Sequence, residues 1–145
     1  QGAVYARSYD YNFHFHLIWV TKYRNQIFTT PQLSQEMQDI LIHIANLHDI
    51  KIEKMEVMPD HVHILISFPP KYSATNVVKA LKGGSARLFL HNHPEIKQQQ
   101  YWGGNLWSRS YYMSTLGDMS REVVENYIAA QRTVKSNAGR PKHKK

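Results

Sequence analysis

Residues 58–68 read Met-Pro-Asp-His-Val-His-Ile-Leu-Ile-Ser-Phe, and this stretch decides the fold. The Pro59-Asp60 pair is typical of a turn, and apolar residues follow it at every second position from Val62. Because successive side chains of a strand point to opposite faces, residues 61–68 are predicted to form a strand with one apolar face. Residues 50–58 read as another strand, so the turn is expected to join the two in a hairpin.

Strand and helix patterns flank the hairpin on both sides. They are, in chain order, a strand at 13–20, a helix opened by Thr30-Pro31, a helix capped by Ser73 that runs to about His91, a strand at 105–115, and a helix that starts at Asp118 or Ser120 and runs to about Arg132. The first six elements follow the order of split βαβ, ferredoxin-like folds. We therefore predict an α+β fold, a ferredoxin-like/RRM-like antiparallel four-stranded sheet with helices packed on one face. The C-terminal helix would be added at the edge or on the far side.

Length and composition indicate one globular domain. The chain has 145 residues, of which 42% are hydrophobic and 20% charged. We expect a single domain over residues 1–132 and a basic, flexible tail over 133–145. There is no cysteine, so disulfides and thiolate metal sites are excluded and any metal must bind His, carboxylate or amide groups.

The charge balance favours a polyanionic partner. Eighteen Lys and Arg residues face eleven Asp and Glu residues, which leaves a formal net charge of +7. An aromatic content of 12% favours single strands, because exposed bases stack on aromatic rings. The sequence has neither a membrane-spanning stretch nor a signal peptide, so we expect a cytoplasmic protein without a membrane partner.

His61 and His63 share the polar face of the predicted third strand. Alternate residues of a strand lie about 6.5–7 Å apart, a spacing at which two imidazoles can bind one cation. A lone His-x-His is more often a pair of surface histidines, and His14-Phe15-His16 has the same spacing in the first strand. Spacing alone therefore does not separate a metal site from two surface side chains.

Tyr127 and Gln131 lie four residues apart on the predicted last helix and so share one face. Alone, this pair more often reflects packing and solvation than chemistry. Together with the histidines it has another meaning. Two imidazoles and one amide oxygen form an open metal shell, and a neighbouring tyrosine supplies a nucleophile.

Five segments carry a resemblance that spans roughly residues 11–132. They are LIWVTKYR (17–24), MPDHVHILIS (58–67), VKALKGGSAR (78–87), WGGNLWSRSY (102–111) and YIAAQ (127–131). With them the chain closely resembles the single-tyrosine transposases of small bacterial and archaeal insertion sequences. These are the TnpA-type members of the His-hydrophobic-His (HUH) endonuclease superfamily.

The resemblance implies a role for each chemical position. His61 and His63 correspond to the metal pair, Gln131 to the third ligand of a Mg²⁺ or Mn²⁺ ion, and Tyr127 to the nucleophile. His14-Phe15-His16 falls outside the metal motif of the family. The implied reaction nicks and rejoins single-stranded DNA at the ends of insertion sequences through a 5′-phosphotyrosine. The implied partners are hairpin DNA and a second copy of the chain, in a homodimer whose active sites can be shared between subunits.

Basic and aromatic residues in the same segments are candidates for DNA contacts. They are Lys22, Arg24, Lys79, Lys82, Arg87, Trp107, Arg109 and Tyr111. For each basic residue a solvated surface position is an equally good interpretation. For Trp107 and Tyr111, packing in the core is the stronger alternative.

Three other functions fit parts of the pattern. A non-catalytic single-stranded nucleic-acid-binding module uses the same kind of sheet, although the aromatic strand signature of RNA-recognition domains is absent from the sequence. A domesticated relative that processes chromosomal repeat hairpins would have the same chemistry. A plain His-metal hydrolase would cut DNA without forming a protein–DNA adduct.

Overall fold

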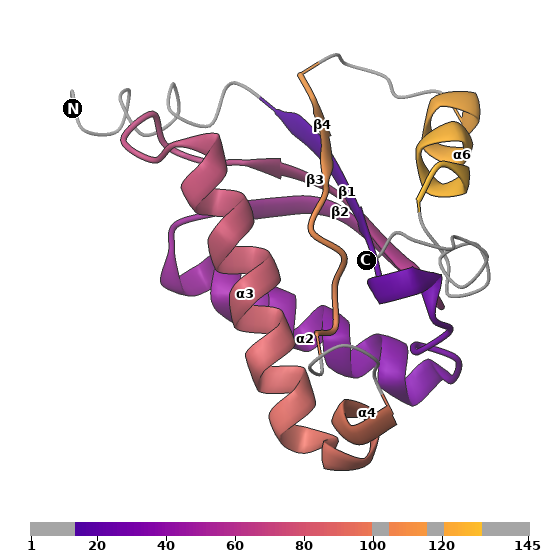
Figure 1. Ribbon diagram of the computed structural model, residues 1–145. Helices are drawn as coiled ribbons and strands as arrows, with labels where there is room; N and C mark the ends of the chain where they lie inside the picture. Colours follow the sequence, from indigo (N-terminus) through magenta and orange to yellow (C-terminus); the bar gives the residue numbers. More distant parts are fainter. Residues whose placement is uncertain (1–13, 100–104, 116–120, 132–145) are drawn as a thin grey trace, which may run out of the picture.

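The computed structural model describes residues 14–99, 105–115 and 121–131 (Figure 1). Along the chain they form β1 (Phe15–Val20), the 3₁₀ helix η1 (Lys22–Arg24), α2 (Pro31–Leu47), β2 (Lys51–Met58), β3 (His61–Ser67), α3 (Ala74–Asn92), α4 (Pro94–Gln99), β4 (Tyr112–Ser114) and α6 (Arg121–Ala129). The strands form one antiparallel sheet in the order β2-β3-β1-β4. This confirms the α+β fold that the order of elements predicts.

Both long helices begin where the sequence indicates. The Thr30 side chain accepts a hydrogen bond from the Leu33 amide at 3.1 Å, and Pro31 occupies the first position of α2. The Ser73 side chain accepts one from the Asn76 amide at 3.1 Å and caps α3 in the same way. Each cap satisfies an amide that lacks a partner in the first helical turn.

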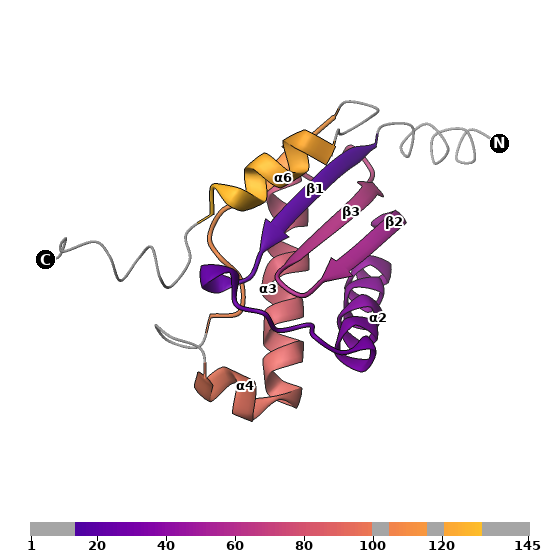
Figure 2. The same ribbon diagram turned by 90° about the vertical axis from the view of Figure 1, so that its right-hand side faces the viewer.

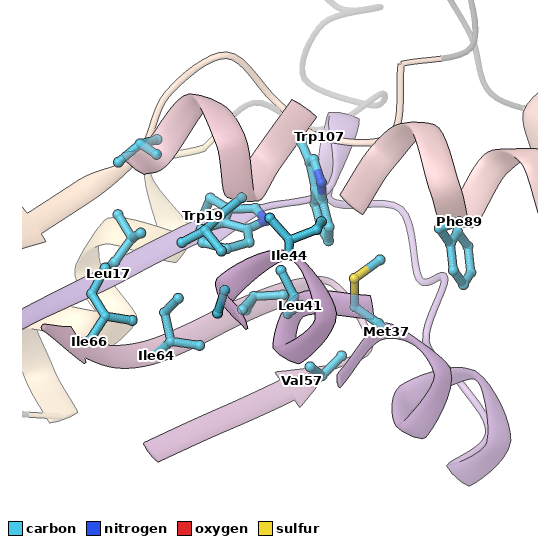
Figure 3. Close-up of a cluster of buried hydrophobic side chains, with 14 of the residues drawn as sticks. Leu17, Trp19, Met37, Leu41, Ile44, Val57, Ile64, Ile66, Phe89 and Trp107 are labelled. Atoms are coloured by element: carbon cyan, nitrogen blue, oxygen red, sulfur yellow. The ribbon is translucent and has the colours of Figure 1, made fainter. Parts of the chain in front are cut away.

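The hydrophobic core lies between the sheet and the pair α2 and α3 (Figure 3). Leu17 and Trp19 of β1 and the apolar face of β3 point into it, and α2 contributes Met37, Leu41 and Ile44. In β3 Val62, Ile64 and Ile66 are buried with partly exposed residues between them, and the last residue of the strand, Ser67, is buried as well. The predicted two-residue period of this strand is therefore confirmed.

The opposite face of the sheet carries α6. Figure 2 shows α6 in front of the sheet beside β1, with α3 behind the sheet. Ile18 and Val20 of β1 point to this face and are fully buried, although neither belongs to the main core cluster. Contacts between α6 and β1 contribute to covering them. The C-terminal helix is thus on the far side of the sheet, one of the two predicted places.

The fourth strand is shorter than the predicted span of 105–115. Regular pairing covers only Tyr112–Ser114, with one further bridge between Thr21 and Trp107. The intervening segment turns its carbonyls to Lys82 of α3, whose ammonium lies 2.8 Å from the Ser108 oxygen and 2.9 Å from the Ser110 oxygen. Carbonyls bound to a side chain are not free for a strand partner, so the ladder begins only after this segment.

Other boundaries also differ from the predicted ones. The sequence did not predict α4, which follows α3 directly at Pro94. The last helix ends at Ala129, so Gln131 lies just beyond it, although the Gln131 amide still bonds to the Ile128 carbonyl at 3.1 Å. The proposed helix starts at residues 118 and 120, and the basic tail over 133–145, lie outside the described residues. Within the described ranges no helix is long and apolar enough to cross a membrane.

Candidate active site on the far face of the sheet

His61 and His63 lie on the face of β3 opposite to the core. Their neighbour Val62 is fully buried, whereas both histidines are partly exposed. The strand period therefore presents both imidazoles on the face that carries α6, as predicted.

Asp60 orients the first histidine. Its Oδ1 atom lies 2.9 Å from Nδ1 of His61, and its Oδ2 atom lies 3.5 Å from Nε of Arg24. Because a carboxylate only accepts hydrogen bonds, His61 Nδ1 must carry the proton. In the neutral ring Nε2 is then left with its lone pair. A carboxylate that accepts from the second nitrogen is the usual support of a metal-binding histidine.

The turn that carries Asp60 is held by backbone bonds. The amide of Thr21 donates to the Asp60 carbonyl at 2.9 Å, and the amides of Ile27 and Phe28 both donate to the Pro59 carbonyl. Thr21 itself is fully buried, and its hydroxyl donates to the Asn25 carbonyl at 2.7 Å. The segment after β1 thereby fixes the start of β3 and the position of its first histidine.

His63 lies against His16 of β1. His63 Nε2 and His16 Nδ1 are 3.4 Å apart, so one ring donates to the other. Burial lowers the pKa of His63, the nearby His16 and His61 lower it further, and Glu56 partly opposes them. The neutral ring, which is the form that binds a metal, is therefore favoured.

A row of paired residues crosses the sheet from the histidines to the last helix. Glu56, His63, Ile18 and Tyr112 are successive Cα partners across β2, β3, β1 and β4. Paired residues of antiparallel strands share a face, so these side chains point to the α6 side. Two strand spacings, about 10 Å, separate the backbones of His63 and Tyr112. The Tyr112 ring in turn lies beside the Tyr127 ring, with 5.7 Å between centroids.

Ser110 contacts both candidate site residues of the C-terminal segment, Tyr127 and Gln131. Its Oγ atom lies 3.0 Å from the Tyr127 hydroxyl and donates to Oε1 of Gln131 at 2.8 Å. Gln131 Nε2 donates to the Tyr127 carbonyl at 3.0 Å. Burial raises the pKa of Tyr127 above its ordinary value. The phenol is therefore protonated at neutral pH.

Imidazole nitrogens and an amide oxygen are donors that suit a divalent metal, although no contact found among the described residues joins Gln131 to either histidine. His61 is supported by a carboxylate, neutral His63 is favoured, and the Gln131 oxygen is fixed in orientation. Among the described residues no three His, Cys, Asp or Glu side chains form a possible metal site. A site with these residues would therefore combine two imidazoles with the amide oxygen predicted as third ligand.

Comparison with known proteins gives the family. Residues 9–131 match the family described as IS200-like transposases, and this match covers most of the chain. The chain belongs to the IS200-like transposases. It is therefore a member of a family of DNA-cleaving enzymes.

Individual relatives agree with this family. The transposase is 42% identical over 126 residues to the ISDra2 transposase TnpA of Deinococcus radiodurans, a match that covers 87% of this chain and 89% of the relative. It is 28% identical over 121 residues to the transposase for insertion sequence element IS200 of Salmonella typhimurium, covering 83% and 78%.

Solved structures share the fold. A crystal structure of a Deinococcus radiodurans R1 protein described as a transposase superposes with a TM-score of 0.77 at 40% identity, covering 83% of this chain and 92% of that one. A REP-associated tyrosine transposase bound to a REP hairpin superposes with a TM-score of 0.51 at 15% identity, covering 81% of this chain and 61% of that one. The second likeness concerns the fold alone.

Two of the residues predicted to contact DNA have structural roles in this transposase. Trp107 is 7% exposed, and its indole nitrogen donates to the Ser85 hydroxyl at 3.0 Å, so packing accounts for it. Lys82 binds three carbonyls, and burial lowers its pKa to about 8. At neutral pH Lys82 is still mostly charged, and its ammonium binds backbone carbonyls of the protein itself.

The other candidates do not gather at one point, and two of them lie on α3, on the opposite side of the sheet from α6. Lys22 and Arg24 form the η1 turn, in which Tyr23 and Arg24 both have a φ of 56°. Such left-handed non-glycine residues cluster at functional sites. The remaining four are exposed: Lys79 and Arg87 on α3, and Arg109 and Tyr111 before β4. Tyr111 lies under the Lys82 ammonium, 6.0 Å from it. Their role in DNA binding stays a prediction.

Asp60, His16 and Ser110 are site residues that the sequence analysis did not assign. A turn aspartate directly before the histidine pair is a signal that could have indicated Asp60. His16 belongs to the His14-Phe15-His16 segment, which falls outside the metal motif that the resemblance implies. Ser110 has no signal in the sequence, because its contacts depend on where α6 packs.

Proposed function

We propose that this transposase nicks and rejoins single-stranded DNA at insertion-sequence ends, with Tyr127 as nucleophile. The observation that carries the proposal is the row from His63 through Ile18 to Tyr112, on which the Tyr127 ring packs. The row supports the proposal because it runs from His63 to the ring beside Tyr127 on one face of the sheet. The resemblance to single-tyrosine transposases supports the same assignment.

In the proposed reaction the Tyr127 oxygen attacks a scissile phosphate. A bond forms between that oxygen and phosphorus, and the bond to the 3′ oxygen breaks. The phenol loses its proton, the 3′ oxygen leaves as a hydroxyl after taking up a proton, and a 5′-phosphotyrosine remains. Attack by another 3′-hydroxyl on this linkage rejoins DNA and releases Tyr127. The energy of the phosphodiester is conserved, so no nucleotide is hydrolysed.

His61, His63 and Gln131 would hold a Mg²⁺ or Mn²⁺ ion. When bound, such an ion polarises the phosphate and stabilises the leaving oxygen. Asp60 keeps His61 in the tautomer with a free Nε2, and the environment of His63 favours its neutral form. Burial raises the pKa of Tyr127, so at neutral pH the phenol is a weak nucleophile. The phosphate must therefore be activated by the other groups of the site.

The test is a covalent adduct on 3′-labelled single-stranded hairpin DNA from the ends of the element. Wild-type protein with Mn²⁺ or Mg²⁺ should give a slow-moving band on a denaturing gel, because the labelled strand stays attached through its 5′ phosphate. Tyr127→Phe and His61→Ala should each abolish the band. The matched controls are Tyr72→Phe and His43→Ala. Tyr72 lies just before the start of α3, and His43 lies on the exposed surface of α2.

Three results would oppose the proposal in different ways. Cleavage by Tyr127→Phe without an adduct would indicate hydrolysis by a metal-bound water. Binding without cleavage under either metal would favour a non-catalytic binding module. An adduct of equal yield on duplex DNA would contradict the preference for single strands.

A homodimer with shared active sites is proposed from the resemblance alone. In the single chain described here α6 lies over its own sheet, which supports a site completed within one chain. Mixed dimers of Tyr127→Phe and His61→Ala subunits separate the two arrangements. Each dimer retains one intact tyrosine helix and one intact histidine pair on different subunits, so recovered adduct formation requires sharing.

A further inference from the structure

The Ser110 hydroxyl is the one group that contacts both Tyr127 and Gln131 among the hydrogen bonds found in the described residues. A hydroxyl carries a single proton. Because this proton goes to Oε1 of Gln131, the 3.0 Å contact between Ser110 and Tyr127 must use the proton of the phenol. Ser110 therefore accepts from one side chain and donates to the other.

This arrangement also fixes the amide of Gln131. Its Nε2 donates to the Tyr127 carbonyl, which can only accept, so Oε1 is the atom that faces Ser110. An amide oxygen has two lone pairs, and Ser110 occupies one of them. Within the described residues no other group contacts this oxygen, so its second lone pair can bind a hard cation.

Lys82 holds the backbone on which Ser110 lies. Its ammonium is 2.8 Å, 3.3 Å and 2.9 Å from the carbonyl oxygens of Ser108, Arg109 and Ser110, respectively. Lys82 projects from α3, which packs on the opposite side of the sheet from α6. One side chain thus ties the segment before β4 to a long helix of the core.

We infer that Ser110 is a positioning residue of the transposase: its hydroxyl orients the phenol of Tyr127 and the amide oxygen of Gln131, on a backbone held by Lys82. The inference rests on the proposed function of these two residues. Loss of the hydroxyl removes the contact that orients the phenol and the Gln131 oxygen, while the bond of Gln131 Nε2 to the Tyr127 carbonyl remains. Groups that orient metal ligands typically contribute 10–100-fold to metal affinity or activity, on the order of what we expect here.

The test compares Ser110→Ala with Ser110→Thr and Ser108→Ala. Ser108 lies two residues away on the same segment, and its buried hydroxyl has no hydrogen-bond partner among the described residues, which makes it a matched control. Two quantities are measured: Mn²⁺ affinity of the DNA-free protein by titration calorimetry, and the rate of adduct formation at saturating DNA. Ser110→Ala should weaken Mn²⁺ binding by roughly 10-fold or more and slow the adduct similarly. Ser110→Thr, which keeps the hydroxyl, should restore most of both.

Lys82→Met gives a second, independent variant. It removes the donor to the three carbonyls but keeps the Ser110 hydroxyl. Lys82→Met should therefore lower Mn²⁺ affinity, as Ser110→Ala does. Unchanged affinity and rate in Ser110→Ala, with wild-type protein active, would overturn the inference and leave the proposed function intact. Equal losses in Ser110→Ala and Ser108→Ala would overturn it too. A wild-type protein that forms no adduct would refute the proposed function, and the inference with it.

Discussion

At the scale of single residues, Asp60 determines how the first histidine is presented. Its carboxylate contacts both His61 and Arg24, at 2.9 Å and 3.5 Å. Asp60→Asn should weaken Mn²⁺ binding by about 10–100-fold, because an amide at this position accepts less strongly and can turn its NH₂ group toward the ring. Titration calorimetry on the DNA-free protein measures the effect.

The control for Asp60→Asn is Asp49→Asn. Asp49 pairs with Lys71 at 3.8 Å on the exposed surface, where such pairs contribute little. Its Mn²⁺ affinity should equal that of the wild type. Equal affinities for the Asp60 variant and the wild type would show that His61 needs no carboxylate support.

The residues of the site differ in how far the sequence could predict them. His61 and His63 could be placed on one face because a strand has a strict two-residue period. Helical spacing alone did not single out Tyr127 and Gln131; their assignment came from the resemblance to single-tyrosine transposases, and Gln131 lies just past the helix end. The contact of His16 with His63 depends on the register between β1 and β3, which a single sequence does not specify.

At the scale of elements, the glycine pair in α3 governs how closely α2 and α3 approach. A Cβ at Gly84 would lie 2.9 Å from Cδ1 of Ile44 in α2, whereas one at Gly83 would meet nothing within 4 Å. Gly83→Ala should raise the free energy of unfolding by about 0.5–1 kcal/mol through helix propensity alone. Gly84→Ala gains the same propensity but must displace a buried isoleucine, so it should be less stable than Gly83→Ala.

Urea unfolding followed by circular dichroism measures both glycine variants. They differ by one position on the same helix, so each is the matched control of the other. Equal stabilities would mean that Ile44 moves aside without cost and that Gly84 has no role in helix packing.

The elements show where sequence patterns stop being informative. Thr30, Pro31 and Ser73 predicted helix starts correctly because a cap is a local interaction. The fourth strand was predicted too long, because Lys82 takes carbonyls that a strand would need. That interaction joins residues 26 to 28 positions apart, beyond the reach of local periodicity.

At the scale of the whole molecule, His93 makes stability depend on pH. It links the start of α4 to α2 through Glu36 at 2.7 Å, and Glu95 lies 3.3 Å from its other nitrogen. Burial alone would lower the pKa of His93, but the hydrogen bonds and charges of Glu36 and Glu95 outweigh it and raise the pKa. The stabilisation is therefore fully present below the ordinary histidine pKa of about 6.5 and is lost as pH rises through the higher folded-state pKa.

His93→Gln should reduce the free energy of unfolding by about 1 kcal/mol at pH 6, and by less at pH 8. The quantity to follow is the difference between variant and wild type at each pH, since other groups titrate equally in both. His43→Gln on the exposed side of α2 is the control and should show no such trend. A difference for His93→Gln that stays constant from pH 6 to pH 8 would contradict the assignment.

The alternation along β3 has a consequence for how this enzyme can change over generations. Alternate residues of this seven-residue strand belong to two faces. Val62, Ile64 and Ile66 lie on the face that packs in the core, and the two histidines lie on the face proposed to carry the chemistry. If the histidines have the proposed role, substituting one of them should abolish catalysis while the protein still folds. Deletion or insertion of a single residue within the strand would move the following side chains to the opposite face, and both the core packing and the proposed metal site would be lost at once. Relatives are thus expected to diverge along β3 by replacement, whereas differences in length should accumulate outside it.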